Sequence, residues 1–179
     1  GGWLPIFPCW NSYTAAMIGD HCISAISDAY CKGIRNFDVD KAYEGMRKNA
    51  FETPSNLDEY KNGIGRRALT SYLEYGYIPL EDGVPDAFHT KEQVSRTLEY
   101  AYDDFALAQM AKALGKTDDY QALIRRAANY RNVIDPRTGY AQGRHADGTF
   151  LNDANAFNFA RFITEGAPCH YTWYVPQDP

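Results

Sequence analysis

The chain carries at Thr90–Leu114 the sequence TKEQVSRTLEYAYDDFALAQMAKAL, which predicts its longest helix. Thr90 can cap the start of this helix, and Gly115 can end it. Apolar residues recur at helical spacing in two stripes, Val94, Leu98, Ala101, Phe105 and Ala108 in one and Leu107, Met110 and Leu114 in the other. Two stripes require packing partners on two sides. We therefore expect an inner helix of a layered array.

Further helices are predicted before and after this segment. A mostly apolar helix is expected near Tyr13–Gly33, and Asp38 can cap a second helix that ends near Ala50. A third is expected over Gly63–Tyr75, and one from Thr117 to about Val133. An extended loop is expected at Gly1–Asn11, a turn-rich connection at Glu81–His89, and a hairpin-like loop at Tyr140–Phe150. The pattern predicts an all-α fold of paired helices, because their connections are short.

Composition limits the class of protein. The 179 residues are 45% hydrophobic and 23% charged, as in a soluble domain with a real core. The net charge of -5 argues against a general nucleic-acid partner, and no apolar run approaches the roughly 20 residues of a membrane span. The four cysteines lack metal-ligand spacing. Cys22 and Cys31 would lie roughly 13 Å apart on one helix, so free thiols are expected.

The C-terminal stretch Ile163–Asp178, ITEGAPCHYTWYVPQD, suggests chemistry on sugars. Glu165 lies on a Gly/Pro turn and is followed by His170, Tyr171 and Trp173. A carboxylic acid can protonate the leaving oxygen of a glycosidic bond, and flat rings can cover the apolar faces of a sugar. The stretch is therefore a candidate glycoside-cleaving site.

Two pairs of polar residues stand on predicted helices. Asp20 and His21 lie among apolar residues, where they either close a structural network or line a sugar pocket. Asp103 and Asp104 can do acid/base work, although a structural role is favoured, with partners available in Arg66-Arg67 and Arg125-Arg126. His21 is not favoured as a metal ligand, because no second ligand lies at helical spacing.

Several segments, in order along the chain, resemble the catalytic domain of glycoside hydrolase family 92. They are Gly2–Pro5, Met17–His21, Asp28–Tyr30 with Lys32–Ile34, Ser95–Asp104, and Glu165-Gly166 followed by Tyr171–Trp173, Val175-Pro176 and Asp178. The resemblance implies an exo-acting alpha-mannosidase that inverts the anomeric carbon and needs calcium. It also implies an (α/α)6 toroid behind an N-terminal β-sandwich.

On this resemblance the chain, residues 1–179, is a central fragment of the catalytic domain, without the β-sandwich and without the C-terminal part of the toroid. The general base is expected beyond the C-terminus, and the isolated fragment is expected to be inactive. Calcium ligands are expected mostly outside this chain. The implied partners are a mannose-containing glycan and the remaining domains of the full-length enzyme. The implied location is the periplasm, the cell surface or the exterior.

The resemblance assigns roles to particular residues. Glu165 matches the family's general acid, which needs a raised pKa that Tyr171 and Trp173 can promote by desolvation. The expected substrate-binding residues are Asp20, His21, His170, Tyr171, Trp173 and Trp3. His170 stands where the family commonly has Gln, whose carbonyl suits calcium better than imidazole does. His170 can instead donate to a sugar hydroxyl or a phosphate, or be held by local hydrogen bonds.

The alternative function is a non-catalytic helical interaction module resembling a tetratricopeptide solenoid. The stretch from Ala113 to Ala128 looks locally like one such hairpin. The long loops at Gly1–Asn11 and Tyr140–Pro168 argue against it. The two functions differ in one structural expectation, because the enzyme needs Glu165, Asp20 or His21, and an aromatic ring in one concave site.

Overall fold

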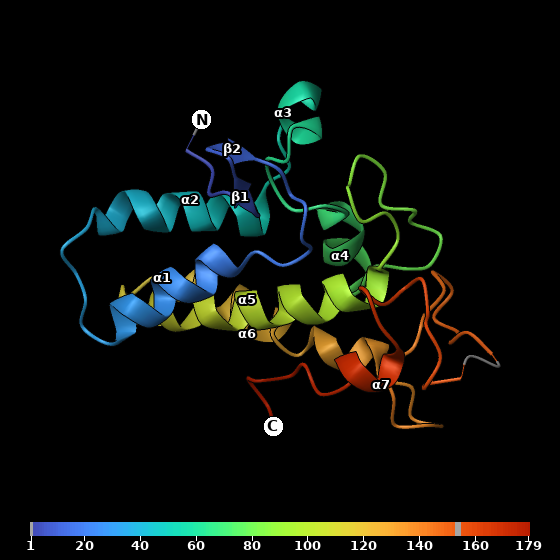
Figure 1. Ribbon diagram of the computed structural model, residues 1–179. Coiled ribbons are helices and arrows are strands. Elements are labelled where there is room, and N and C mark those ends of the chain that lie inside the picture. The colour runs from blue at the N-terminus through green and yellow to red at the C-terminus, as the bar shows by residue number, and fades with distance from the viewer. Residues whose placement is uncertain (1, 153–154) are drawn as a thin grey trace.

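The computed structural model describes residues 2–152 and 155–179. It is mostly helical with one two-stranded sheet (Figure 1). Its elements are β1 (Pro8–Cys9), β2 (Ser12–Tyr13), α1 (His21–Cys31), α2 (Val39–Phe51), α3 (Leu57–Lys61), α4 (Leu69–Tyr75), α5 (Gln93–Ala113), α6 (Thr117–Arg126), the 3-10 helix η1 (Asn129–Val133) and α7 (Pro168–Tyr171). In the described residues no helix combines the length and apolar character needed to cross a bilayer.

The central helix is α5, and the prediction of an inner helix is confirmed. Of its 21 residues, 16 are buried, so it packs on nearly all sides. It begins later than expected, because Lys91 and Glu92 adopt left-handed conformations with φ of 69° and 52°. Thr90 therefore does not cap it. The backbone N–H of Val94 instead donates to Phe162 O at 3.0 Å, so a distant loop satisfies the start of the helix.

The first helix is shorter than the sequence predicted. The region before it forms the β1–β2 hairpin, in which Pro8 pairs with Tyr13 and Cys9 with Ser12. Its turn residues, Trp10 and Asn11, both have positive φ, as two-residue hairpin turns require. Apolar side chains such as Ile18 belong to a loop rather than to a helix. As a result Asp20 and His21 stand at the start of α1 and not in its middle.

The second helix follows the prediction, whereas the third does not. Asp38 caps α2 by accepting from the N–H of Lys41 at 3.0 Å. In place of one helix over Gly63–Tyr75 there are two, α3 and α4. Gly63 separates them with φ of 92°, and a Cβ there would lie 2.5 Å from the Thr14 backbone. This close approach to the N-terminal loop explains the break.

The last predicted helix also divides. α6 ends at Arg126, and the shorter η1 continues to Val133. The hairpin-like loop after it is confirmed by a bridge between Arg144 and Phe150 and by a 2.8 Å bond from the N–H of His145 to Thr149 O. All four cysteines are free, including Cys22 and Cys31 as expected.

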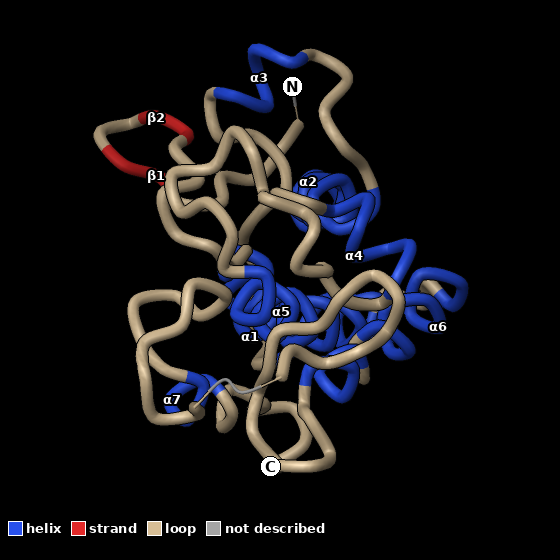
Figure 2. The backbone as a smooth tube through the Cα atoms, turned by 90° about the vertical axis from the view of Figure 1, so that its right-hand side faces the viewer, coloured by secondary structure: helices blue, strands red, loops and turns tan. Residues whose placement is uncertain are grey.

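Two main hydrophobic clusters meet on α5. One joins α1, α2, α5 and α6 through Ile23, Tyr30, Tyr43, Met46, Ala50, Leu107, Ala108, Met110, Ala111 and Leu123. The other joins the first half of α5 to the C-terminal loops through Tyr77, Val94, Leu98, Val133, Ala141, Phe162, Ile163 and Val175. The hairpin and α7 lie on opposite sides of the α1–α5 layer (Figure 2). The helix α5 thus connects the N-terminal helices to the loop that carries Glu165.

Candidate active site

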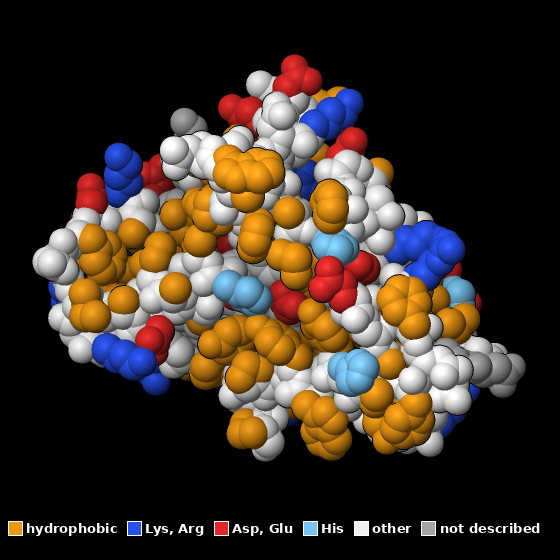
Figure 3. All heavy atoms as spheres, in the orientation of Figure 1, with side chains coloured by type: hydrophobic (Ala, Val, Ile, Leu, Met, Phe, Trp, Pro, Cys, Tyr) orange, Lys and Arg blue, Asp and Glu red, His pale blue; other side chains and the backbone are white. Residues whose placement is uncertain are grey.

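One side of α5 and its start carry polar residues at helical spacing. Glu92, Ser95, Glu99 and Asp103 follow one another at intervals of three or four residues, which places them on one face. His and acidic side chains gather near the middle of one surface of the molecule, bordered by hydrophobic side chains (Figure 3). Glu92 and Glu99 were not singled out from the sequence, although their spacing to Asp103 was a usable signal.

His21 lies over two buried carboxylates of this face. Its Nδ1 is 3.0 Å from Asp103 Oδ1, and its Nε2 is 3.2 Å from Glu99 Oε2. Hydrogen bonds to Asp103 and Glu99 raise the pKa of His21 to about 10, so the imidazole is cationic at neutral pH. The His21 side chain is 47% exposed, whereas those of Asp103 and Glu99 are at most 8% exposed. The site therefore presents a cation at its surface and keeps its negative charge beneath.

Aromatic rings surround this imidazole. The ring centroids of Tyr102 and Tyr174 lie 6.5 and 6.2 Å from that of His21, and Tyr171 lies 6.1 Å from Tyr174. The hydroxyl of Tyr171 donates to Glu99 Oε1 at 2.8 Å. Burial, followed by the charge of Glu99, raises the pKa of Tyr171 and of Tyr174, so both remain neutral donors. Tyr171 thus reaches His21 through Glu99, while Tyr102 and Tyr174 join the site without having been predicted.

Asp20 belongs to a buried ion network beneath His21. It has no exposed surface, and its side chain accepts from Arg66 Nε and from Asn49 Nδ2, each at 3.2 Å. Its backbone N–H donates to Asp103 Oδ2 at 2.8 Å. Burial, against the attraction of Arg66, raises the pKa of Asp20 to about 7. The geometry is that of the structural network, which was one of the two alternatives for this residue.

Asp104 completes the network. Arg66 Nη1 donates to its Oδ1 at 2.8 Å, and Arg126 donates to both of its oxygens at 2.6 and 2.7 Å. Burial alone would raise the pKa of Asp104, but Arg126 and Arg66 outweigh it and hold that pKa below its usual value. The expected structural pairing with neighbouring arginines is confirmed for Asp104. Asp103 instead bonds to His21 and to the backbone of Asp20.

Glu165 stands on a loop fixed to the start of α5. The preceding residue, Thr164, donates through its N–H to Ser95 Oγ at 2.9 Å and through its hydroxyl to Glu92 Oε2 at 2.7 Å. Glu165 has φ of 51°, and its side chain is 69% exposed. Among the described residues its ionisable partner is His89, whose Nε2 lies 3.8 Å from Glu165 Oε1. The described residues therefore leave this carboxyl accessible to a ligand and do not bury it.

The remaining predicted residues are less closely integrated. His170 is exposed, and its Nδ1 accepts from the N–H of Ala167 at 3.1 Å, which is the local hydrogen bond named as an alternative. Trp173 is 80% exposed. Trp3 lies in a different neighbourhood, where its ring faces Lys48 Nζ of α2 at 6.0 Å.

Comparison with known proteins assigns this fold and these residues to a family. The sequence model of the glycosyl hydrolase family 92 catalytic domain matches residues 1–179. The chain belongs to glycoside hydrolase family 92. The resemblance inferred from the ordered segments is thereby confirmed.

Solved family 92 structures superpose closely on the chain. A family 92 alpha-mannosidase from Bacteroides thetaiotaomicron is 39% identical, with a TM-score of 0.82 over 98% of this chain and 21% of its own. The same enzyme has been solved with mannoimidazole. An inverting family 92 mannosidase from that organism is 31% identical, with a TM-score of 0.82 over 97% of this chain and 22% of its own.

A curated relative is an uncharacterized secreted glycosidase from Arthroderma benhamiae. It is 32% identical over 170 residues, which are 83% of this chain and 20% of that protein. The family 92 chain therefore spans about a fifth of the length of the relatives that it matches.

The calcium implied by the resemblance finds no set of ligands among the described residues. No group of three or more His, Cys, Asp or Glu side chains in residues 2–152 and 155–179 is arranged to hold a metal ion. The carboxylates of the α5 face already accept hydrogen bonds, Glu92 from Thr164 and Glu99 from Tyr171. These residues by themselves do not fit a calcium site.

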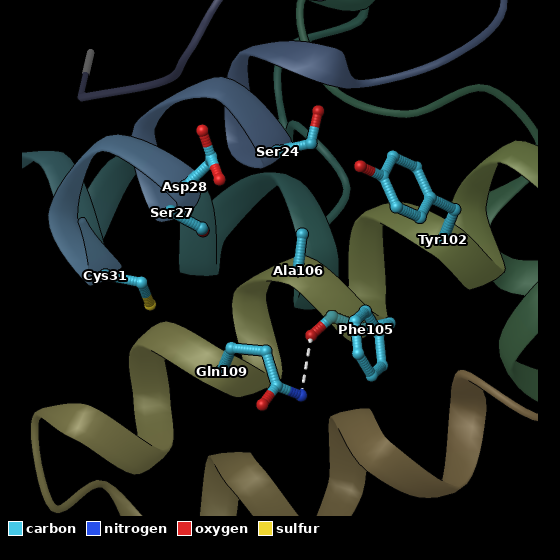
Figure 4. A pocket seen from close by; sticks show the side chains of 8 residues that line it. All are labelled: Ser24, Ser27, Asp28, Cys31, Tyr102, Phe105, Ala106 and Gln109. Carbon is cyan, nitrogen blue, oxygen red and sulfur yellow. Dashed lines mark hydrogen bonds between the residues drawn. The ribbon is translucent and has the colours of Figure 1, made fainter. Parts of the chain in front are cut away.

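A cavity of about 150 Å³ lies between α1 and α5 (Figure 4). It is lined by Ser24, Ser27, Asp28, Cys31, Tyr102, Phe105, Ala106 and Gln109. Its one carboxylate, on Asp28, pairs with Lys32 at 2.7 Å. The cavity shares Tyr102 with the ring cluster around His21, but Glu165 is not part of its lining. The candidate active site of this family 92 chain is therefore the α5 face and not this cavity.

Proposed function

We infer that this chain is part of the catalytic domain of an exo-acting alpha-mannosidase that hydrolyses alpha-linked mannose from glycans with inversion, and that Glu165 is its general acid. The observation that carries the proposal is the loop of Glu165, fixed through Thr164 to the polar face of α5 in a family 92 chain. Support also comes from the alpha-mannosidases that superpose on it, one of them solved with mannoimidazole.

In this mechanism the carboxyl of Glu165 protonates the glycosidic oxygen as the bond to the anomeric carbon breaks. A general acid must hold its proton near the working pH, which burial favours. Since the Glu165 side chain is 69% exposed here, we propose that a segment outside this chain, or the bound glycan, desolvates it. An exposed carboxyl on a fixed loop is free to meet a leaving group.

Inversion needs a second carboxylate, roughly 6.5–9.5 Å from the acid, that activates water. Glu92, Glu99 and Asp103 are poor candidates, because each is bonded to a protein donor. We propose that the base lies beyond the C-terminus of this chain.

The substrate-binding roles follow from chemistry and exposure. Both ring nitrogens of His21 are bonded to Asp103 and Glu99, so this residue can offer a sugar its positive charge and its ring face. Tyr171 and the rings beside it can line the apolar face of a sugar. Asp20 acts from below, by holding the network on which His21 rests. His170, Trp173 and Trp3 stay proposed contacts. His170 and Trp173 are exposed and follow Glu165 closely in the sequence. Trp3 lies against α2, so it could contact only a glycan that extends to that helix.

The whole enzyme is proposed to be longer than these residues, with an N-terminal β-sandwich, an (α/α)6 toroid to which these helices contribute, and a C-terminal part of that toroid. The share of about a fifth of each relative's length supports this. Calcium stays in the proposal with ligands mostly outside this chain, and no step here depends on it. A periplasmic, cell-surface or secreted location is supported by the secreted relative.

The tetratricopeptide-like interaction module is the less supported function. A solenoid stacks repeated helical hairpins, whereas α6 continues into η1 and then into the long loops that lead to α7. The family match over residues 1–179 also favours the enzyme.

The proposal is tested on the full-length enzyme with 1,2-, 1,3-, 1,4- and 1,6-linked alpha-mannobioses. Glu165→Gln is expected to lower kcat/KM by about 10²- to 10⁴-fold, because the amide cannot donate the proton in the same way. Glu74→Gln, which changes an exposed glutamate of α4, is the matched control. Proton NMR of the first product should show beta-mannose if the reaction inverts. Full activity of Glu165→Gln on every linkage would remove Glu165 from the role.

A further inference from the structure

Glu92 is a nearly buried carboxylate that bridges two segments. Its side chain is 11% exposed. Its Oε1 lies 3.0 Å from Nδ1 of His89, three residues earlier, and its Oε2 accepts from the hydroxyl of Thr164 at 2.7 Å. One carboxylate thus holds the loop before α5 and the residue next to Glu165.

The backbone supports the same junction. The N–H of Glu92 donates to Arg161 O at 3.0 Å, and the N–H of Thr164 donates to Ser95 Oγ at 2.9 Å. Lys91 and Glu92 both adopt left-handed conformations, which non-glycine residues take only when the surroundings impose them. The strain lies where α5 meets the loop of Glu165, and strain of this kind gathers at functional sites.

His89 extends this arrangement to Glu165. Nδ1 of the ring faces Glu92 Oε1 at 3.0 Å. The other ring nitrogen, Nε2, faces Glu165 Oε1, at 3.8 Å. The imidazole is held in place, since its side chain is 16% exposed and its ring packs edge-on against Phe88 at 5.0 Å. In space, the His89 ring therefore lies between the carboxylate of Glu92 and the carboxyl of Glu165.

We propose that Glu92 and His89 are positioning residues for the general acid: Glu92 fixes Thr164 and the His89 ring, and His89 Nε2 sets the orientation of the Glu165 carboxyl toward the leaving oxygen. The proposal rests on the function proposed above for Glu165. It assigns a part in the chemistry to the segment that leads into α5, and no short sequence motif joins residues 89, 92 and 165.

The dependence on the leaving group tests this role in the full-length enzyme. An alkyl alpha-mannoside, such as methyl alpha-mannoside, needs protonation of its leaving oxygen, whereas 2,4-dinitrophenyl alpha-mannoside leaves without it. Glu92→Gln and His89→Phe are expected to lower kcat/KM on the alkyl mannoside by about 10- to 100-fold, the loss that a misplaced reacting group causes. On the dinitrophenyl mannoside both variants should stay within about twofold of the parent enzyme.

A second Glu–His pair of this chain supplies the matched control. Glu81 Oε1 lies 2.6 Å from His145 Nδ1 on a different loop. Glu81→Gln and His145→Phe should leave both substrates unaffected. Thr164→Val, which removes only the hydroxyl bond to Glu92, should show the same leaving-group dependence in weaker form, and it gives a test even if Glu92→Gln does not fold.

The outcomes separate the two proposals. An equal loss on both substrates in Glu92→Gln, His89→Phe and Thr164→Val would overturn the positioning role, as would the same loss in the Glu81–His145 pair. If Glu165→Gln itself shows no dependence on the leaving group, the general-acid assignment fails instead. If the loss of activity depends strongly on the leaving group in Glu165→Gln but not in Glu92→Gln, His89→Phe or Thr164→Val, only the positioning role of Glu92 and His89 is refuted.

Discussion

Carboxylates at the middle of α5 are buried in hydrogen-bonded networks, whereas a carboxylate at its start holds an exposed loop. Asp103 and Asp104 are fully buried, and Asp104 is enclosed by Arg66 and Arg126. At the start of the helix, Glu92 bridges His89 and Thr164, and beyond them Glu165 is 69% exposed. The first region closes on itself and fixes the packing of α1, α5 and α6. The second fixes only the base of a loop and leaves the Glu165 carboxyl exposed.

The largest expected effect comes from breaking the closed region. Asp104→Ala leaves the guanidinium groups of Arg66 and Arg126 without their shared partner, and Arg66 is fully buried. Loss of one partner of a buried ion pair costs about 3–5 kcal/mol of stability. Thermal unfolding of the full-length enzyme should therefore shift strongly downward.

The exposed pair of Asp28 and Lys32 provides the control for this measurement. Asp28→Ala should leave the melting temperature nearly unchanged, because exposed pairs of this kind contribute little. A melting temperature that Asp104→Ala leaves unchanged would mean that the network is not a structural element. The contrast with the loop region would then be lost.

The elements of the fold also differ in how far the sequence predicted them. Asp38 at the start of α2 and the two apolar stripes of α5 are local signals, and both were interpreted correctly. The start of α1 and the break at Gly63 depend on how the N-terminal loop packs, and the sequence does not show that packing. Features set by neighbouring residues, such as helical spacing and caps, could be predicted, whereas features set by contacts between distant segments could not.

The candidate site shows the same division. Glu165 and Tyr171 were singled out as a carboxylate followed by aromatic residues, and the family resemblance then assigned their roles. His21 was singled out through its polar character among apolar neighbours. Glu99, which joins His21 to Tyr171, was missed although it shares a helix face with Asp103. Glu92 and His89 could not have been connected to Glu165 without the fold, since more than seventy residues separate them in the sequence.

A smaller effect is expected from pH, at the site between the two regions. Asp103 and Glu99 raise the pKa of His21 from 6.5 to about 10. Because the folded pKa is the higher one, this contribution to stability is complete below about pH 6.5 and is lost as pH rises through about 10. The melting temperature should therefore fall more between pH 7 and pH 10 in the parent enzyme than in His21→Gln.

The pH experiment has a direct spectroscopic check. Imidazole resonances of His21 should keep the chemical shift of the protonated ring well above pH 7. Parallel melting curves for the parent and His21→Gln across this range would show that the carboxylates beneath His21 do not hold its proton. Asp20 affects the pH dependence of stability below about pH 7 and not between pH 7 and pH 10, since burial raises its pKa from 3.8 to about 7.

The smallest effect is expected from Tyr171→Phe, which tests whether the Tyr171–Glu99 hydrogen bond serves ligand binding or only the stability of the fold. The change removes the 2.8 Å hydrogen bond to Glu99 and leaves the ring beside Tyr174. A single hydrogen bond to a buried carboxylate contributes about 1–3 kcal/mol, and His21 still pairs with Glu99, so the loss should lie near the lower limit. Tyr174→Phe keeps the same ring contacts and is the control. If Tyr171→Phe raises KM for a mannoside while the melting temperature barely moves, Glu99 is held for the ligand. If stability falls and KM does not change, the Tyr171–Glu99 bond belongs with the buried network.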